Sequence, residues 1–195
     1  MSTGEEAPRK PVLKLIVVGD GGVGKTTLIH RYLTGIYLDQ RMTVGSGFAT
    51  HNIDVDGITV VLSIWDFAGE ERFRFLMPKY CIGAHGCLLA FDLTRPVTFF
   101  HLDDWLKLVR EHAGQIPILL VGTKLDISPL VRTEAEAYVT IHGLNGYIES
   151  SAKDDVGVQE VFQLVADLMW ARIAYAEPPS RVAEPAKVVD REVSP

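Results

Sequence analysis

The chain has 195 residues, a length that suits one domain, and 47% hydrophobic with 23% charged residues is an ordinary composition for a folded globular protein. The formal net charge of -6 argues against a nucleic-acid binder, because such a protein needs a basic face.

Strand-like and helix-like segments alternate along the chain. Residues 12–19 form a short apolar run that is typical of a strand buried on both faces, and residues 25–35 predict a helix that ends at a glycine. Two β-rich runs within residues 48–66 flank Asp56 and Gly57, a pair suited to a tight hairpin turn. Further strands are expected within residues 83–94, 116–126 and 146–154, and further helices over residues 96–113, 132–143 and 156–176.

This alternation predicts a single α/β domain. We expect a six-stranded, mostly parallel sheet with one antiparallel edge strand from the hairpin and helices on both faces. The domain is expected to span residues 11–176, between mobile tails at residues 1–10 and 177–195 that have no helical stripe.

The first strand and the first helix are joined by a glycine-rich loop. Residues 19–26, GDGGVGKT, fit the pattern G-x-x-x-x-G-K-[ST] in the strand-to-helix context that this motif requires. Polyphosphate needs a ring of backbone N–H donors, and glycines let the backbone wrap it with unusual φ angles. Lys25, expected at the surface of the cleft, supplies a charge for the outer phosphates, and Thr26 supplies a hydroxyl for Mg²⁺. The motif alone does not separate ATP from GTP, or a kinase from a switch.

Three later segments fit the same kind of site. Asp66 ends a β-rich run, where a carboxylate can hold Mg²⁺, and Gly69 can offer its N–H to a γ-phosphate. Asp126 follows a strand in TKLD, and its carboxylate can accept from the ring N–H and the amine of guanine, a donor pair that adenine lacks. A backbone N–H in residues 151–153, SAK, can meet the guanine oxygen.

These segments, in this order, resemble the small GTPases of the Ras superfamily over about residues 14–172. WDFAGEERFRF and YCIGAHG are similar to the Rab sequences WDTAGQERFR and YYRGAHG. The resemblance implies a P-loop NTPase small G domain that binds GTP or GDP with Mg²⁺, hydrolyses GTP slowly and changes the loops at residues 37–47 and 66–79. Thr123 matches the T-K-x-D of Rho proteins, but residues 126–151 leave no room for the additional helix typical of Rho.

The resemblance also implies roles for individual residues. Thr43 would bind Mg²⁺ and the γ-phosphate, Tyr37 would pack across guanine, and the Lys124 stem would cover its other face. The expected nucleotide-binding residues are Gly21, Gly22, Val23, Gly24, Lys25, Thr26, Thr27, Tyr37, Thr43, Gly69, Thr123, Lys124, Asp126, Ser151, Ala152 and Lys153. The expected metal ligands are Thr26, Thr43 and Asp66, and the expected catalytic residues are Glu70, Lys25 and Gly69.

Glu70 is the largest departure from the family pattern, which usually has a water-orienting glutamine there. Glutamate keeps an acceptor but loses the donor, so it either still positions water or leaves a guanine-nucleotide-binding scaffold with little useful hydrolysis. Arg41 is either an internal arginine finger or a solvated loop residue. A third reading, an ATP-dependent phosphotransferase, is disfavoured by Asp126 and by the lack of an acceptor-binding insert.

The resemblance further implies protein partners. Phe48, Trp65 and Tyr80 lie where Rab proteins carry an aromatic triad that contacts effectors, and an exchange factor and a GTPase-activating protein are expected. No signal peptide, membrane-spanning run or C-terminal prenylation cysteine is evident. We therefore expect a cytoplasmic monomer without a covalent lipid anchor, which reaches membranes only through a partner; whether its C-terminus is natural or truncated stays open.

Overall fold

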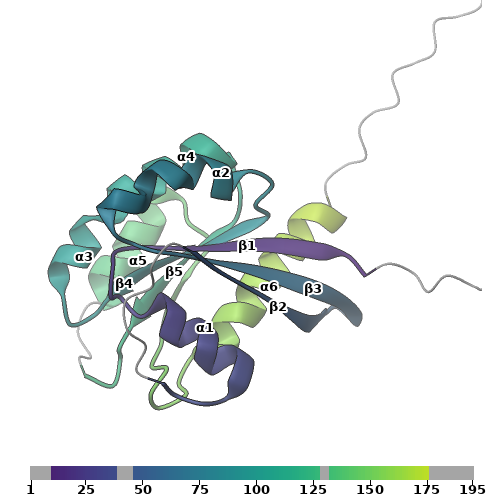
Figure 1. The fold of residues 1–195 in the computed structure, drawn as a ribbon, viewed down its shortest axis with the longest axis horizontal. Helices are drawn as coiled ribbons and strands as arrows, with labels where there is room; N and C mark the ends of the chain where they lie inside the picture. Colours follow the sequence, from purple (N-terminus) through teal and green to yellow (C-terminus); the bar gives the residue numbers. More distant parts are fainter. Residues whose placement is uncertain (1–9, 39–45, 128–131, 176–195) are drawn as a thin grey trace, which may run out of the picture.

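The computed structural model describes residues 10–38, 46–127 and 132–175 (Figure 1). Of the predicted tails, residues 1–9 and 177–195 lie outside this described part, and Lys10 lies within it. Thr43 and Arg41 also lie outside it. None of the described helices is long and apolar enough to cross a membrane.

A six-stranded sheet forms the middle of the molecule, in the order β2-β3-β1-β4-β5-β6. β2 pairs antiparallel with β3, and the neighbouring pairs from β3 to β6 are parallel, which confirms the predicted sheet. The strands are β1 (Val12–Val18), β2 (Ser46–Val55), β3 (Ile58–Phe67), β4 (Gly86–Asp92), β5 (Ile118–Thr123) and β6 (Tyr147–Glu149).

The β2–β3 hairpin turns at Asp56 and Gly57, as predicted. Both residues have positive φ, 52° and 76°, the conformation that a two-residue turn between twisted strands requires. The Gly57 amide donates to the Asp54 carboxylate at 3.1 Å, which closes the turn.

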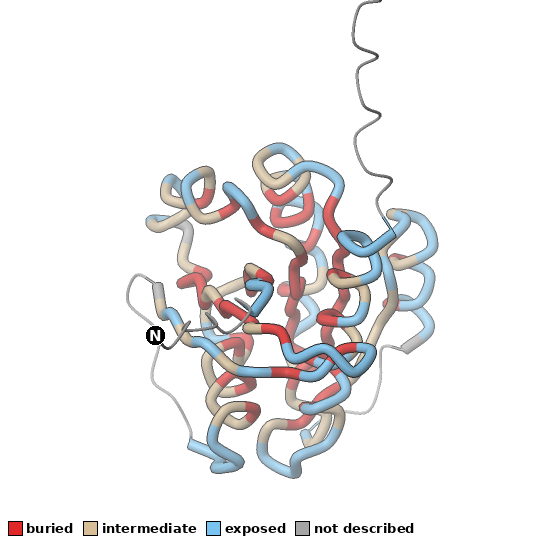
Figure 2. Tube along the Cα trace, turned by 90° about the vertical axis from the view of Figure 1, so that its right-hand side faces the viewer, coloured by how far each residue is buried: buried red, intermediate tan, exposed pale blue. Residues whose placement is uncertain are grey.

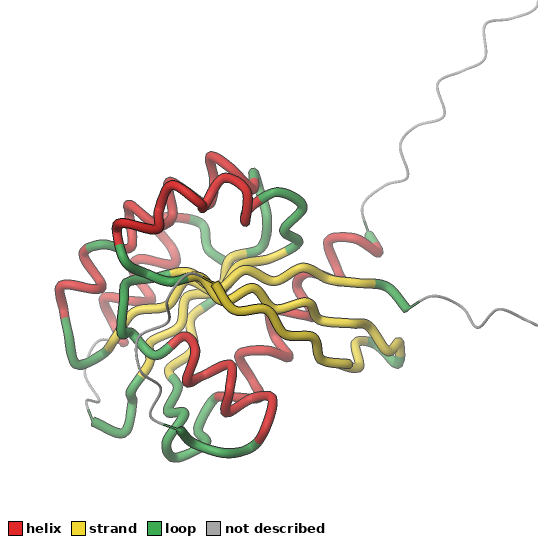
Figure 3. Tube along the Cα trace, viewed as in Figure 1, coloured by secondary structure: helices red, strands yellow, loops and turns green. Residues whose placement is uncertain are grey.

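Helices cover both faces of the sheet, as Figures 1 and 3 show. α1 (Lys25–Thr34) and α6 (Val158–Ala174) cover one face. The other face carries α2 (Met77–Cys81), α3 (Pro96–Phe100), α4 (Leu102–Ala113) and α5 (Arg132–His142), with the short 3-10 helix η1 (Glu71–Leu76) leading into α2.

The single helix expected over residues 96–113 is in fact two helices, α3 and α4, so that expectation was wrong. The break lies at His101, whose amide bonds back to the Val97 carbonyl while its ring nitrogen Nδ1 lies 2.6 Å from a carboxylate oxygen of Asp20. His101 therefore makes a polar contact with a distant loop at the point where the segment, whose apolar spacing alone predicts one continuous helix, divides into two.

Two cores form because strand side chains alternate between the faces. Leu13, Leu15 and Val17 of β1 join the cluster under α1 and α6, whereas Ile16 and Val18 join the cluster under α2–α5. Figure 2 shows buried residues concentrated in the middle of the fold. Cys81 and Cys87 are free thiols that are buried in the second of these clusters.

The parallel strands end at one edge of the sheet, and this edge is where the predicted motifs meet. β1 leads into the glycine-rich loop, β3 ends beside Asp66, and β5 leads into the TKLD segment. Ligands of open α/β sheets bind outside the carboxyl ends of the strands. The topology therefore gathers motifs that lie far apart in the sequence.

Candidate nucleotide-binding site

The glycine-rich loop, residues 19–24, turns sharply between β1 and α1. Gly19, Gly22 and Gly24 have φ angles of 138°, 71° and 100°, a region that other residues rarely adopt, whereas Gly21 has no positive φ. Gly19 also has no room for a side chain, because a β-carbon there would lie 2.1 Å from the Ala90 carbonyl oxygen. The loop conformation thus depends on glycine at these positions.

Lys25 is buried rather than exposed at the cleft surface, so that expectation is corrected. Only 5% of the residue is accessible, and its ammonium donates to the carbonyls of Gly19 and Asp20, each at 2.8 Å. Burial lowers the pKa of Lys25 to about 8, against the opposing attraction of Asp66 and Asp20. The side chain therefore also braces the loop from within, because a buried ammonium needs acceptors.

Two of the three predicted metal ligands lie together. The Thr26 hydroxyl donates to Asp66 Oδ2 at 2.5 Å, while the other oxygen, Oδ1, is buried without a hydrogen-bond partner among the described residues. Burial raises the pKa of Asp66, although the Thr26 hydrogen bond and Lys25 oppose this shift. A buried carboxylate with an uncommitted oxygen beside a hydroxyl fits Mg²⁺, which prefers oxygen ligands. The third predicted ligand, Thr43, lies outside the described residues.

Gly69 lies directly against the glycine-rich loop. A β-carbon at this position would approach the Gly19 carbonyl oxygen to 2.1 Å and the Asp20 carbonyl oxygen to 2.5 Å. The next residue, Glu70, forms an ion pair with Arg72, with Glu70 Oε2 and Arg72 Nε 2.5 Å apart. The Glu70 side chain is 23% exposed, so water can reach its carboxylate.

A pocket beside the loop holds the predicted guanine reader. It contains about 460 Å³ of empty space, including solvent at its open mouth. The Asp126 side chain is only 9% exposed, and its Oδ1 accepts from the Ser151 hydroxyl at 2.8 Å while Lys153 Nζ lies 3.9 Å from its Oδ2. The lining residues are Gly24, Thr27, Leu28, Tyr37, Thr123, Lys124, Asp126, Ile127, Ser150, Ala152 and Lys153.

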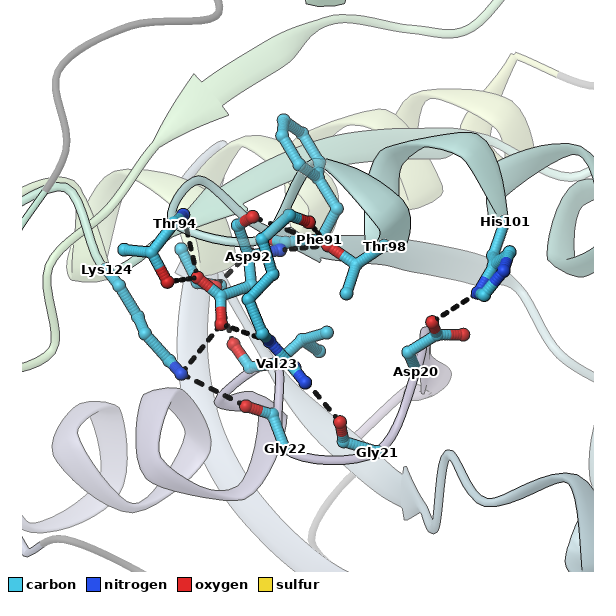
Figure 4. A network of polar contacts seen from close by, with 12 residues as sticks. Asp20, Gly21, Gly22, Val23, Phe91, Asp92, Thr94, Thr98, His101 and Lys124 are labelled. Atoms are coloured by element: carbon cyan, nitrogen blue, oxygen red, sulfur yellow. Dashed lines mark hydrogen bonds and ion pairs between the residues drawn. The ribbon is translucent and has the colours of Figure 1, made fainter.

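Thr123 and Lys124 connect this pocket to the glycine-rich loop. The Thr123 hydroxyl lies 2.5 Å from the Val23 carbonyl oxygen and 2.8 Å from that of Phe91, and its one proton serves both. Lys124 has a positive φ of 62°, and its ammonium contacts the Gly22 carbonyl at 3.1 Å and a carboxylate oxygen of Asp92 at 2.7 Å (Figure 4).

Sequence reasoning missed several residues of this region. Ile127 and Ser150 line the pocket. The sequence signal that could have indicated them is their position, since Ile127 directly follows Asp126 and Ser150 directly precedes the SAK segment. The Ser150 hydroxyl is buried without a hydrogen-bond partner in the described part of the chain, so the pocket has an unused donor and acceptor. Arg95 also bonds to the loop at Gly21, and Asp92 bonds to Arg95, but no local motif marks either residue.

The predicted aromatic triad forms one cluster beside this site. Trp65 packs edge-to-face against Phe48 and Tyr80, with ring centroids 5.3 and 5.6 Å apart. Phe48 is 63% exposed, although large aromatic side chains normally contribute to the core. The cluster therefore offers an apolar surface on the β2–β3 hairpin.

Comparison with known proteins places the chain among Ras-related proteins. The family model of the Ras family matches residues 14–171. The chain is 42% identical over 159 residues to Ras-related protein YPTC6 of Chlamydomonas reinhardtii, across 79% of this chain and 73% of that protein. It is 41% identical over 168 residues to Ras-related protein RABA2a of Arabidopsis thaliana (84% and 77%), and 35% identical over 173 residues to Ras-related protein Rab-19 of Xenopus laevis (86% and 81%).

Proposed function

This chain belongs to the Ras family as a Rab-like small GTPase, and from that premise we propose that it is a slow GTP-hydrolysing switch whose nucleotide site is the one described above. Small GTPases of this family bind GTP or GDP with Mg²⁺ and hydrolyse GTP. The observation that carries the site assignment is the buried Oδ1 of Asp66, which has no hydrogen-bond partner among the described residues and lies beside the Thr26 hydroxyl.

We assign the nucleotide contacts by their chemistry. The backbone N–H groups of residues 21–27 bind the phosphates, with Lys25 as their countercharge. Asp126 accepts the two adjacent N–H donors of guanine, and Tyr37 and Lys124 flank the base, since all three residues line one pocket. Thr26 and Asp66, together with Thr43, are the proposed Mg²⁺ ligands; the ion supplies charge neutralisation between the phosphates.

Hydrolysis requires a positioned water, and we propose that Glu70 holds it as an acceptor. The nearby Arg72 guanidinium offsets the carboxylate charge, which would otherwise repel the γ-phosphate. Lys25 and Gly69 are the other proposed catalytic residues, and each would act by contacting the γ-phosphate. Loss of that phosphate would release Thr43 and Gly69, so the loops at residues 37–47 and 66–79 would change between the two states.

The aromatic triad of Phe48, Trp65 and Tyr80 is the proposed effector surface, supported by the exposure of Phe48. We expect a monomer that is regulated by an exchange factor and a GTPase-activating protein. Cytoplasmic location, with membrane contact only through a partner, remains part of the proposal.

The second candidate function is a guanine-nucleotide-binding scaffold without useful hydrolysis. The Glu70–Arg72 ion pair favours it, because an occupied carboxylate has less capacity to hold water. An ATP-dependent phosphotransferase is the third reading, and competition between GTP and ATP for a fluorescent guanine nucleotide separates it from the other two.

Single-turnover GTP hydrolysis by the purified protein, with Mg²⁺ and without a partner, decides between switch and scaffold. Glu70→Gln should hydrolyse GTP within about tenfold of the wild type, a barrier change of about 1.4 kcal/mol or less, because an acceptor remains. Glu70→Ala should be slower than both, with nucleotide affinity almost unchanged. If Glu70→Ala matches the wild type, Glu70 is a bystander, and Arg41 or a partner becomes the first candidate.

A further inference from the structure

The side of the glycine-rich loop next to β4 is braced by a buried carboxylate with two cations. The Asp92 side chain is completely inaccessible, and its Oδ2 lies 2.8 Å from Arg95 Nε and 2.7 Å from Lys124 Nζ. Its Oδ1 accepts from the amide and the hydroxyl of Thr94, at 2.9 and 2.6 Å (Figure 4). The carboxylate is thus held in one orientation and in turn orients both cations.

Each cation also bonds to the loop. Arg95 Nη2 donates to the Gly21 carbonyl at 3.0 Å, and Lys124 Nζ donates to the Gly22 carbonyl at 3.1 Å. Two consecutive peptide groups are therefore held by their oxygens from the same buried anchor. Because the C=O and N–H of a trans peptide point in opposite directions, the amides of Gly22 and Val23 are turned to the other side of the loop.

We propose that Arg95 is a positioning residue for the bound nucleotide, which together with Lys124 and Asp92 clamps the loop carbonyls so that the loop amides stay directed at the phosphates. This inference rests on the proposed nucleotide site. The clamp acts by preorganisation: a loop already held in its binding conformation loses less conformational freedom when polyphosphate enters.

Charge supports the same role. Two cations share one carboxylate, which leaves one excess positive charge beside the loop that receives polyphosphate. The Arg95 side chain is 43% exposed, so its fork keeps donors accessible to solvent while it bonds both Asp92 and Gly21. Arg95 is also close enough to Lys25 for its charge to oppose protonation of that ammonium.

The test is the release rate of a fluorescent GDP derivative, chased with excess GDP, from the full chain and its variants. Wild-type binding of the derivative is measured first, and its absence would overturn the proposed nucleotide site rather than the clamp. Arg95→Ala should then release GDP about tenfold faster, the factor that corresponds to about 1.4 kcal/mol and to the loss of a charged hydrogen bond. The release rate of Arg95→Lys should lie between those of the wild type and Arg95→Ala, because an ammonium keeps the positive charge but cannot donate to Asp92 and Gly21 from two separate nitrogens as the guanidinium does.

Arg172→Ala is the matched control, because Arg172 lies in the last turn of α6, at the end of the sheet where β1 begins (Figure 1). Its release rate should stay within twofold of the wild type.

Removing Mg²⁺ with a chelator should leave the ratio between the release rates of Arg95→Ala and the wild type unchanged, because the clamp acts on the loop and not on the metal. A ratio below two, or one that disappears with the chelator, would overturn the proposal. If Arg95→Ala lacks a native circular dichroism spectrum, the Arg95→Lys variant provides the test instead. Release of GDP from Arg95→Lys that is faster than from the wild type supports the clamp, and release at the wild-type rate overturns it.

Discussion

Replacing Asp92 with asparagine should destabilise the protein by about 2–3 kcal/mol. The wild-type carboxylate accepts from four donors, two of Thr94 and one each of Arg95 and Lys124. Asparagine has one acceptor oxygen and an amide group that donates, so its NH₂ must face donors on one side. Removing one partner of a buried ion pair costs about 3–5 kcal/mol. The expected loss of stability is smaller here, because the Arg95 and Lys124 side chains are 43% and 35% exposed and can turn to water when the carboxylate is lost.

The same substitution should change the acid limb of the stability curve. Burial alone would raise the pKa of Asp92, but the hydrogen bonds from Lys124, Thr94 and Arg95 outweigh it, so the pKa lies below its usual 3.8. A carboxylate with a lowered pKa contributes stability above pH 3.8, and this stability is lost as the pH falls through the folded-state value. Asp92→Asn should therefore remove the part of the acid destabilisation that this group causes below about pH 4.

Urea unfolding followed by circular dichroism, with GDP and Mg²⁺ in excess and at pH values from 3 to 7, measures both effects. Asp167→Asn is the control: this carboxylate is exposed on α6 and accepts from Gln163, so its loss should cost less than about 0.5 kcal/mol. The reasoning would be refuted if Asp92→Asn also cost less than about 0.5 kcal/mol at pH 7 and kept the wild-type acid limb.

Two further substitutions test the base pocket and the contact between Gly69 and the loop. Asp126→Asn should weaken GTP binding by about 2 kcal/mol or more and should allow xanthine nucleotides to bind. The reason is that xanthine has a carbonyl where guanine has its amine, and the carboxamide of asparagine can donate to that carbonyl. If GTP affinity in a competition assay is unchanged, Asp126 does not bind the base. Gly69→Ala puts a β-carbon 2.1 Å from the Gly19 oxygen, so the two segments must separate by more than 1 Å. We expect a loss of about 1–3 kcal/mol in urea unfolding and slower GTP hydrolysis, and wild-type values of both would show that this close contact is absent in solution.

Features that depend on local backbone requirements could be predicted from the sequence. The glycine-rich loop needs residues that tolerate positive φ, and Gly22 and Gly24 have it. Asp56 and Gly57 form the hairpin turn for the same reason. The alternation of apolar runs predicted the parallel sheet, since buried strands and amphipathic helices have different periods. Asp66 and Asp126 were predicted because each lies at or just after the C-terminal end of an apolar run, and the structure places Asp66 in the last residues of β3 and Asp126 in the segment that follows β5.

Features that depend on contacts between distant segments were decided only by the tertiary structure. Arg95 and Lys124 bond to the loop across 74 and 102 residues of sequence, because the sheet order places β4 next to β1 and β5 next to β4, so that all three strands end on the same side as the loop. The burial of Lys25 and the contact of His101 with Asp20 were also decided by packing, since both side chains meet groups of the glycine-rich loop. A sequence motif shows which groups a site contains, but the packing of the sheet edge determines which of them are buried, paired and held in place.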